Sequence, residues 1–274
     1  MCQRKYVKDL LHETGMANCK PLTVPLTPNL KLYTTTGKSL EDPNNFRRLM
    51  GKLIYLSITK LDISFAVQFL SQLMSTPTDA HLKEAFHVLR YLRATPCHGV
   101  FSTHSDFQLR AFCDSDWGSC PNSLKSVTGY AVMLGSSLIS WKSKKQSVVS
   151  RSTVEGEYRA MATTCYELTW LLALLRDLNV QPLLPIQLFY DNNVALHIVK
   201  NPVFHKRTKY IELDYHYVYD KFKIGQVHPC YVTSRNQLAD LFTKVASAGQ
   251  YAYLPSKLGV VSFTQPLALG GVWK

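Results

Sequence analysis

The chain has 274 residues, of which 46% are hydrophobic and 18% are charged, so it has enough apolar material for a sizeable core and is not an intrinsically disordered protein. Its 31 Lys and Arg against 19 Asp and Glu give a net charge of +12, which makes nucleic acid or another polyanion a candidate partner. No apolar run approaches the roughly 18–20 residues of a membrane span, and seven cysteines without a Cys-x-x-Cys pair favour a reducing intracellular compartment.

The first hundred residues predict a small helical bundle. A short helical patch near residues 6–13 precedes a helix that opens at Asp42 and Pro43, where the fixed φ of proline suits the first turn. Apolar residues at helical spacing predict two further helices over residues 62–74 and 79–93, each followed by a proline. Three amphipathic helices joined by short turns pack as a bundle.

Near residue 100 the hydrophobic period changes from that of helices to that of strands. The pattern predicts strands over residues 109–113, 130–134, 138–141, 186–190 and 227–232, and helices over 152–178, 192–200, 212–223 and near residue 236. Three antiparallel strands, a helix and then strand–helix pairs predict a mixed α/β sheet flanked by helices.

Four acidic residues fall at the ends of these elements. Asp114 and Asp191 each end an apolar strand, Glu157 lies in the first turns of the long helix, and Asp240 lies early in the last helix. Clustered carboxylates repel one another unless divalent cations neutralise them, and their hard oxygens suit Mg²⁺ or Mn²⁺. Two such ions can hydrolyse a phosphodiester. Each acid alone is more simply a cap or turn residue, but four in this order favour the metal site.

Six motifs occur in order: CDSDW (113–117), SWKSKKQ (140–146), STVEGEY (152–158), YDN (190–192), NPVFHKRTK (201–209) and NQLADLFTK (236–244). Because they carry these six motifs, residues 107–243 resemble the ribonuclease H domain of copia-type retrotransposon Pol polyproteins. The runs RRLMGKLIYL (47–56) and DISFAV (62–67) resemble the end of the reverse transcriptase that precedes it there.

The resemblance implies a ribonuclease H-like five-stranded sheet whose catalytic residues and metal ligands are Asp114, Glu157, Asp191 and Asp240. It also implies two Mg²⁺ or Mn²⁺ ions, cleavage of the RNA strand of an RNA–DNA hybrid, and an intracellular location, in cytoplasmic virus-like particles or in the nucleus. We expect a helical, thumb-like region over residues 1–100, the nuclease domain over 101–250 and a tail of uncertain structure over 251–274. The family's Tyr-x-Asp-Asp polymerase turn is absent from the sequence, so polymerase activity is not expected and the palm and fingers of the parent polyprotein are expected partners.

Two basic clusters are candidates for nucleic-acid binding. Lys142, Lys144 and Lys145 beside Trp141 could follow a phosphate backbone with an aromatic platform, or they could form a solvated turn. The second cluster comprises Lys206, Arg207 and Lys209.

Two departures from the family affect the long helix and the last loop. Gly156 stands where the family has Ala, which costs a helix about 1 kcal/mol. Residues 233–235 stand where many ribonucleases H have a mobile His.

Glu155 and Glu157 lie about 200° apart around the helix, so both cannot face one metal pair. Ser152 and Glu155 fit a capping box, and Glu155 is expected to pair with Arg159 on the solvent side.

Two alternatives stay open. The chain could be a catalytically silent transposon remnant or a domesticated nucleic-acid-binding protein. An integrase-type transposase is disfavoured, because that class orders its acids Asp, Asp, Glu and this chain orders them Asp, Glu, Asp, Asp.

Overall fold

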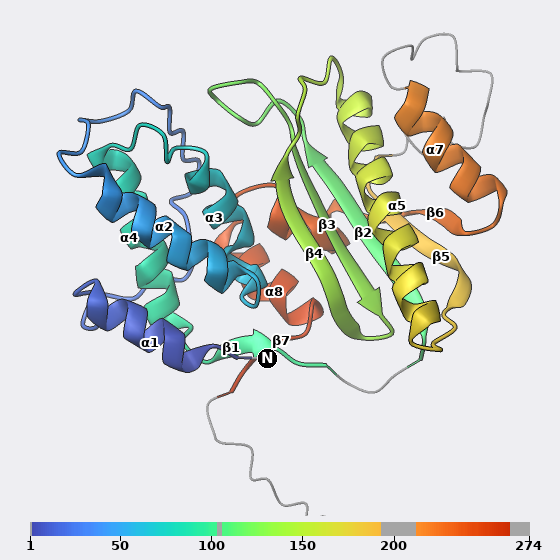
Figure 1. The fold of residues 1–274 in the computed structure, drawn as a ribbon, viewed down its shortest axis with the longest axis horizontal. Coiled ribbons are helices and arrows are strands. Elements are labelled where there is room, and N and C mark those ends of the chain that lie inside the picture. The colour runs from blue at the N-terminus through green and yellow to red at the C-terminus, as the bar shows by residue number, and fades with distance from the viewer. Residues whose placement is uncertain (1, 103–105, 193–211, 264–274) are drawn as a thin grey trace, which may run out of the picture.

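The computed structural model describes residues 2–102, 106–192 and 212–263, which form a helical part and a sheet part side by side (Figure 1). The predicted helix over residues 192–200 lies outside the described residues except for its first position. The helical part consists of α1 (Arg4–Glu13), α2 (Pro43–Ser57), the 3₁₀ turn η1 (Leu61–Ile63), α3 (Ser64–Ser71) and α4 (Asp79–Ala94).

The helices of the first part begin where the sequence supplies caps. The Asp42 side chain accepts a hydrogen bond from the Asn44 N–H at 3.0 Å, and Pro43 takes the first position of α2. The Thr78 side chain caps α4 in the same way. The apolar faces of these helices bury a common core that includes Phe46, and each such side chain contributes roughly 1.5–3 kcal/mol of hydrophobic stabilisation. The predicted helical bundle therefore forms.

The second part is built on a five-stranded mixed sheet in the order β4-β3-β2-β5-β6. Its strands are β2 (Gln108–Asp116), β3 (Val127–Leu134), β4 (Ser137–Lys145), β5 (Leu183–Tyr190) and β6 (Val227–Tyr231). The first three strands pair antiparallel, and β5 runs parallel to both β2 and β6. This is the mixed five-stranded α/β sheet flanked by helices that the sequence predicted.

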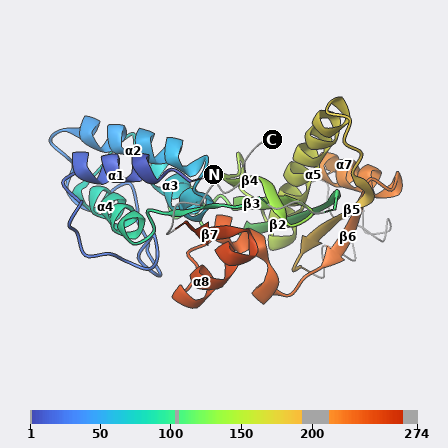
Figure 2. The same ribbon diagram turned by 90° about the horizontal axis from the view of Figure 1, so that it is seen from below.

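Helices cover both faces of this sheet (Figure 2). The long helix α5 (Thr153–Asp177) and α7 (Glu212–Lys223) share one apolar core with the sheet, and η4 (Leu238–Phe242) and α8 (Ala248–Lys257) pack on the other face. No helix within the described ranges is both long enough and apolar enough to cross a membrane.

The single helix predicted near Asn236 is wrong. In its place lie two short 3₁₀ turns, η3 (Ser234–Asn236) and η4. Gln237 between them has extended backbone angles, with φ −73° and ψ 100°. Its side chain donates a hydrogen bond to the Cys113 carbonyl of β2 at 2.9 Å. This long-range contact interrupts the helix and ties the segment to the sheet.

The stretch after residue 250, to which the sequence assigned no structure, completes α8 and then forms a short strand. That strand, β7 (Val260–Ser262), pairs antiparallel with β1 (His98–Val100), which links the helical part to the sheet part. The chain thus returns at residue 262 to the place where it left the helices.

A buried ion pair lies in the helical part. Lys60 Nζ lies 3.6 Å from Asp62 Oδ2, and both side chains are only 2% exposed. Lys60 also donates to the Thr95 carbonyl beyond the end of α4 at 2.9 Å, and Tyr91 donates its hydroxyl to Asp62 at 2.7 Å. Every charge in this group therefore has a partner, which is the condition for burying one.

Replacing Lys60 by Met is expected to destabilise the chain by about 3–5 kcal/mol, because Asp62 would be left as an uncompensated buried charge. The control is Lys52→Met, which breaks the surface pair between Lys52 and Glu13 and should cost at most about 1 kcal/mol. Urea unfolding of both variants gives the comparison. Equal losses would contradict the assignment of Lys60 as a buried partner.

Candidate metal centre

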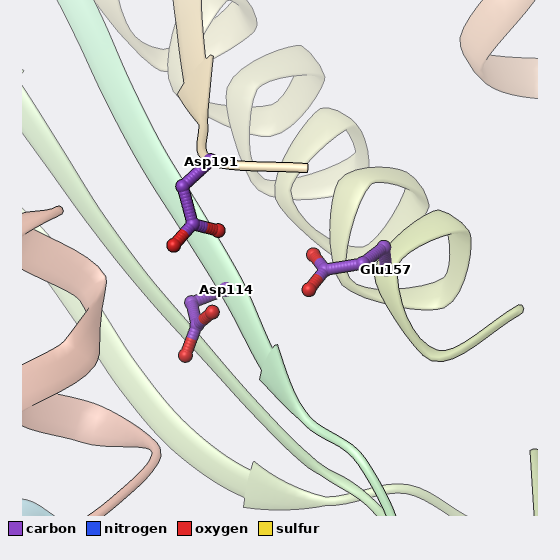
Figure 3. Close-up of side chains that lie close together, drawn as sticks. All are labelled: Asp114, Glu157 and Asp191. Atoms are coloured by element: carbon purple, nitrogen blue, oxygen red, sulfur yellow. The ribbon is translucent and has the colours of Figure 1, made fainter. Parts of the chain in front are cut away.

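Three carboxylates meet at one edge of the sheet. Asp114 lies near the end of β2, Asp191 directly follows β5, and Glu157 projects from the first turns of α5. One carboxylate oxygen of each lies within 4.8 Å of the others, and Figure 3 shows the three side chains turned toward one another. Because β2 and β5 are parallel neighbours, their carboxyl ends reach the same edge of the sheet, which brings the two aspartates together.

Gly156 lies where α5 packs closely against β2, next to Glu157. A Cβ atom at position 156 would lie 2.8 Å from the Ser115 Oγ atom. The Gly156 carbonyl accepts a hydrogen bond from the Gln146 side chain at 3.0 Å. The glycine that is expected to weaken the helix therefore lies at its close contact with the sheet, where a larger residue would require the Ser115 hydroxyl to rotate.

The two glutamates of α5 face different surroundings. Glu155 Oε1 lies 2.9 Å from Arg159, and Glu155 Oε2 accepts the Arg151 N–H at 2.8 Å. The expected pair with Arg159 is confirmed, but its expected place on the solvent side is wrong, because Glu155 is only 5% exposed. The Ser152 side chain caps the helix, which is half of the predicted capping box, while the Glu155 carboxylate accepts from the Arg151 N–H in place of the Ser152 N–H. Glu157 alone faces the carboxylate cluster.

Asp240 approaches the cluster from the opposite face of the sheet. It lies on η4, which packs directly against β3 at Gly129, the residue paired with Asp114. A Cβ atom at position 129 would lie 2.9 Å from the Ala239 carbonyl and 2.6 Å from the Thr243 methyl group. Only glycine therefore lets η4 bring Asp240 beside Asp114.

Hydroxyl groups and an ammonium group hold the acids in place. Thr243 donates a hydrogen bond to Asp114 Oδ2, and Ser234 donates one to Asp191 Oδ2 at 2.8 Å. Lys244 Nζ lies 2.9 Å from Asp240 Oδ1 and 3.9 Å from Asp114 Oδ2. The sequence pattern alone gives these three residues no role. The spacing of Lys244 four residues after Asp240 was the available signal.

Comparisons with known proteins identify relatives of the chain. No family model matches the sequence. The chain is 41% identical to the Retrovirus-related Pol polyprotein from transposon RE1 of Arabidopsis thaliana over 95% of its length, and 41% identical to that from transposon RE2 over 99%. The chain belongs to the copia-type retrotransposon Pol family. It spans 18–19% of the length of these two relatives.

Among solved structures, a ribonuclease H1 isolated from compost aligns with 50% of this copia-type chain at 12% identity. The alignment covers 93% of that structure, with a TM-score of 0.34.

Without a bound cation, the acidic side chains at the metal centre of this Pol chain resist ionisation. Burial, and then the charges of Asp114 and Asp191, raise the pKa of Glu157 to about 9. Burial, and then the charge of Asp114, raise the pKa of Asp240 to about 7. Burial also raises the pKa of Asp114, against the opposing effect of Lys244. These shifts have the sign expected of carboxylates gathered without enough positive charge.

The donor set fits a hard divalent cation. Glu157 Oε2 is buried and has no hydrogen-bond partner among the described residues, so one ligand position is left for an ion. Converging carboxylate oxygens are the ligands that Mg²⁺ and Mn²⁺ prefer. Asp114, Glu157 and Asp191 could therefore hold such an ion.

In EDTA, the chain is expected to lose stability as the pH rises from about 4.5 to about 9. The pKa of Glu157 is about 9 in the folded chain, against an ordinary value of 4.5. The folded state therefore binds this proton more tightly than the unfolded state does, which stabilises the fold at low pH. This stabilisation is lost as the pH rises through the folded-state pKa and the proton leaves. Glu157→Gln removes this contribution. Its thermal midpoint in EDTA should fall less steeply with pH than that of the unaltered chain, and equal slopes would contradict the prediction.

The basic residues predicted to bind nucleic acid lie in different places. Lys142, Lys144 and Lys145 belong to β4 and, with Arg159, line a groove of about 260 Å³ beside α5. Trp141 is partly buried in the core on the η4 and α8 side of the sheet. Trp141 and Lys142 also line a second groove of about 600 Å³, so the indole lies beside Lys142, while Lys144 and Lys145 line only the first groove. Lys206, Arg207 and Lys209 lie outside the described residues.

Proposed function

We propose that the chain is a metal-dependent ribonuclease H that hydrolyses the RNA strand of RNA–DNA hybrids. The observation that carries the proposal is the convergence of Asp114, Glu157 and Asp191 within 4.8 Å in a ribonuclease H-like sheet. Membership of a Pol family supports a nucleic-acid substrate. Asp114, Glu157 and Asp191 would hold one Mg²⁺ or Mn²⁺ ion, and Asp240 with Asp114 would complete a second position.

When bound, a pair of divalent cations activates a water molecule and stabilises the leaving oxygen of a phosphodiester. The chain's own residues keep the ligands in position for this chemistry. Thr243 fixes the rotamer of Asp114, and Ser234 fixes that of Asp191. Ligands held in this way lose less conformational freedom when the substrate binds.

The lysines of β4 are the proposed contact for the nucleic-acid backbone. Lys142, Lys144 and Lys145 lie on the antiparallel side of the sheet, and the groove they line borders α5, whose first turns carry Glu157. Lysines that contact phosphates fix the register of a duplex without reading its sequence. Replacing all three should weaken hybrid binding and reduce its dependence on salt.

The test is an assay of the purified chain on a hybrid with labelled RNA. Mg²⁺ or Mn²⁺ should support cleavage of the RNA strand, whereas Ca²⁺ and excess EDTA should not, and single-stranded RNA should survive. Cleavage that persists in excess EDTA would refute the metal-dependent mechanism. Hybrid binding without cleavage in Mg²⁺ would favour the silent, nucleic-acid-binding alternative.

A further inference from the structure

Lys244 divides the four acids into two unequal groups. The oxygens of Asp114, Glu157 and Asp191 gather within 4.8 Å of one another. Asp240 is instead engaged by the Lys244 ammonium, whose Nζ lies 2.9 Å from Asp240 Oδ1. The same Nζ lies 3.9 Å from Asp114 Oδ2. The ammonium therefore touches both carboxylates that a second cation would share.

The side chain of Lys244 is placed so that it can leave. It is 40% exposed, whereas the side chains of Asp240 and Asp114 are 3% and 5% exposed. A lysine is a point charge on a flexible four-carbon stem, so its head can move into solvent without displacing the backbone. The carboxylates are fixed by η4, β2 and the Thr243 hydroxyl. The ammonium is thus the mobile member of the group.

We propose that Lys244 is a built-in counter-ion, which neutralises Asp240 and Asp114 in the metal-free chain and must be displaced before a second divalent cation binds. This inference rests on the proposed function and specifies how its metal site fills. The first cation meets the carboxylates of Asp114, Glu157 and Asp191, where the ammonium comes no nearer to Asp114 than 3.9 Å. The second cation must replace the closer contact of 2.9 Å between the ammonium and Asp240. Two like charges a few ångströms apart repel strongly at the low dielectric of a buried site. The second position therefore binds its ion more weakly than the first.

The experiment measures metal binding, without nucleic acid, to the full chain stripped in EDTA. Mn²⁺ is titrated calorimetrically into the unaltered chain, Lys244→Gln, Lys244→Arg and Lys223→Gln. The last variant removes the same charge from an exposed residue at the end of α7, for which the described part of the chain shows no ion pair with the acids. Lys244→Gln should gain about tenfold or more in affinity for Mn²⁺, or bind one more ion per chain. Lys223→Gln should match the unaltered chain.

A second readout is the thermal midpoint with and without Mn²⁺. In EDTA, Lys244→Gln should melt at a lower temperature than Lys223→Gln, because its carboxylates have lost their counter-ion, and Mn²⁺ should raise its midpoint by more. Lys244→Arg retains the positive charge and should stay within about threefold of the unaltered chain in affinity. If Lys244→Gln does not fold in EDTA, Lys244→Arg still tests the proposal. Because it keeps the positive charge, a large gain in its Mn²⁺ affinity would overturn the counter-ion role.

The outcomes separate this inference from the proposed function. In one outcome, Asp114→Asn abolishes Mn²⁺ binding and Lys244→Gln leaves it unchanged. This result would overturn the counter-ion role alone. An unaltered chain that binds no Mn²⁺ at the acids would overturn the metal-dependent function and the counter-ion role together.

Discussion

Replacing Glu157 by Gln is expected to lower hybrid cleavage by at least about a thousandfold while the chain stays folded. The change removes one negative charge and one anionic ligand oxygen from a cluster whose oxygens lie within 4.8 Å of one another, and metal-assisted hydrolysis depends on that charge. A thousandfold loss corresponds to about 4 kcal/mol of transition-state stabilisation. The measurement is the single-turnover cleavage rate in Mg²⁺, with the thermal midpoint as a check of folding.

Glu155→Gln is the matched control, two residues away in the same helix. Glu155 binds Arg159 and the Arg151 N–H and does not reach the cluster. Its replacement should cost about 1–2 kcal/mol of stability, through a weakened ion pair and cap, and should leave the cleavage rate within a few-fold. An inactive Glu155→Gln beside an active Glu157→Gln would reverse the site assignment.

Replacing Gly129 by Ala is expected to reduce cleavage by about a hundredfold, although residue 129 carries no functional group. The new Cβ would meet the Ala239 carbonyl at 2.9 Å and the Thr243 methyl group at 2.6 Å. Backbone cannot yield as a side-chain tip can, so η4 must move away from β3 and carry Asp240 and Thr243 with it. Such overpacking typically costs 1–3 kcal/mol of stability.

The control for this variant is Gly51→Ala in α2, where an added Cβ meets nothing within 4 Å. That change should leave cleavage intact and stabilise the helix by up to about 1 kcal/mol. Comparing the Mn²⁺ affinity of Gly129→Ala with its cleavage rate separates a displaced acid from general unfolding. Full activity in Gly129→Ala would show that η4 does not need its close contact with the sheet.

The sequence predicted the parts of the site that depend on local pattern. An apolar strand followed by Asp was read correctly at Asp191, because strand periodicity is a local property. At Asp114 the strand was found but its end was not, since pairing with β3 carries β2 on to Asp116. The apolar stripe that begins at Ala160 and Met161, three and four residues after Glu157, is buried against the sheet as expected. These features follow from neighbours within one helical turn or one strand.

The rest depends on contacts between residues far apart in the chain. Thr243 is 129 residues from the Asp114 carboxylate that it binds, and Gln237 is 124 residues from the Cys113 carbonyl. No local period encodes such pairs, so the helix predicted near Asn236 proved to be two 3₁₀ turns shaped by tertiary contacts. The burial of Glu155 was missed for the same reason, since helical spacing gives the angle of a side chain but not what packs over it.

The pairing of β1 with β7 brings the two ends of the sheet part together. His98 is the partner of Ser262 across this two-stranded ladder, so the segment from 98 to 262 enters and leaves at a single point. Neighbouring strands lie only about 5 Å apart, a gap that a short loop can close. The old ends of residues 98–262 could therefore be joined and new ends opened at an exposed turn to give a circular permutant, and the same segment could be inserted into a surface loop of a carrier protein.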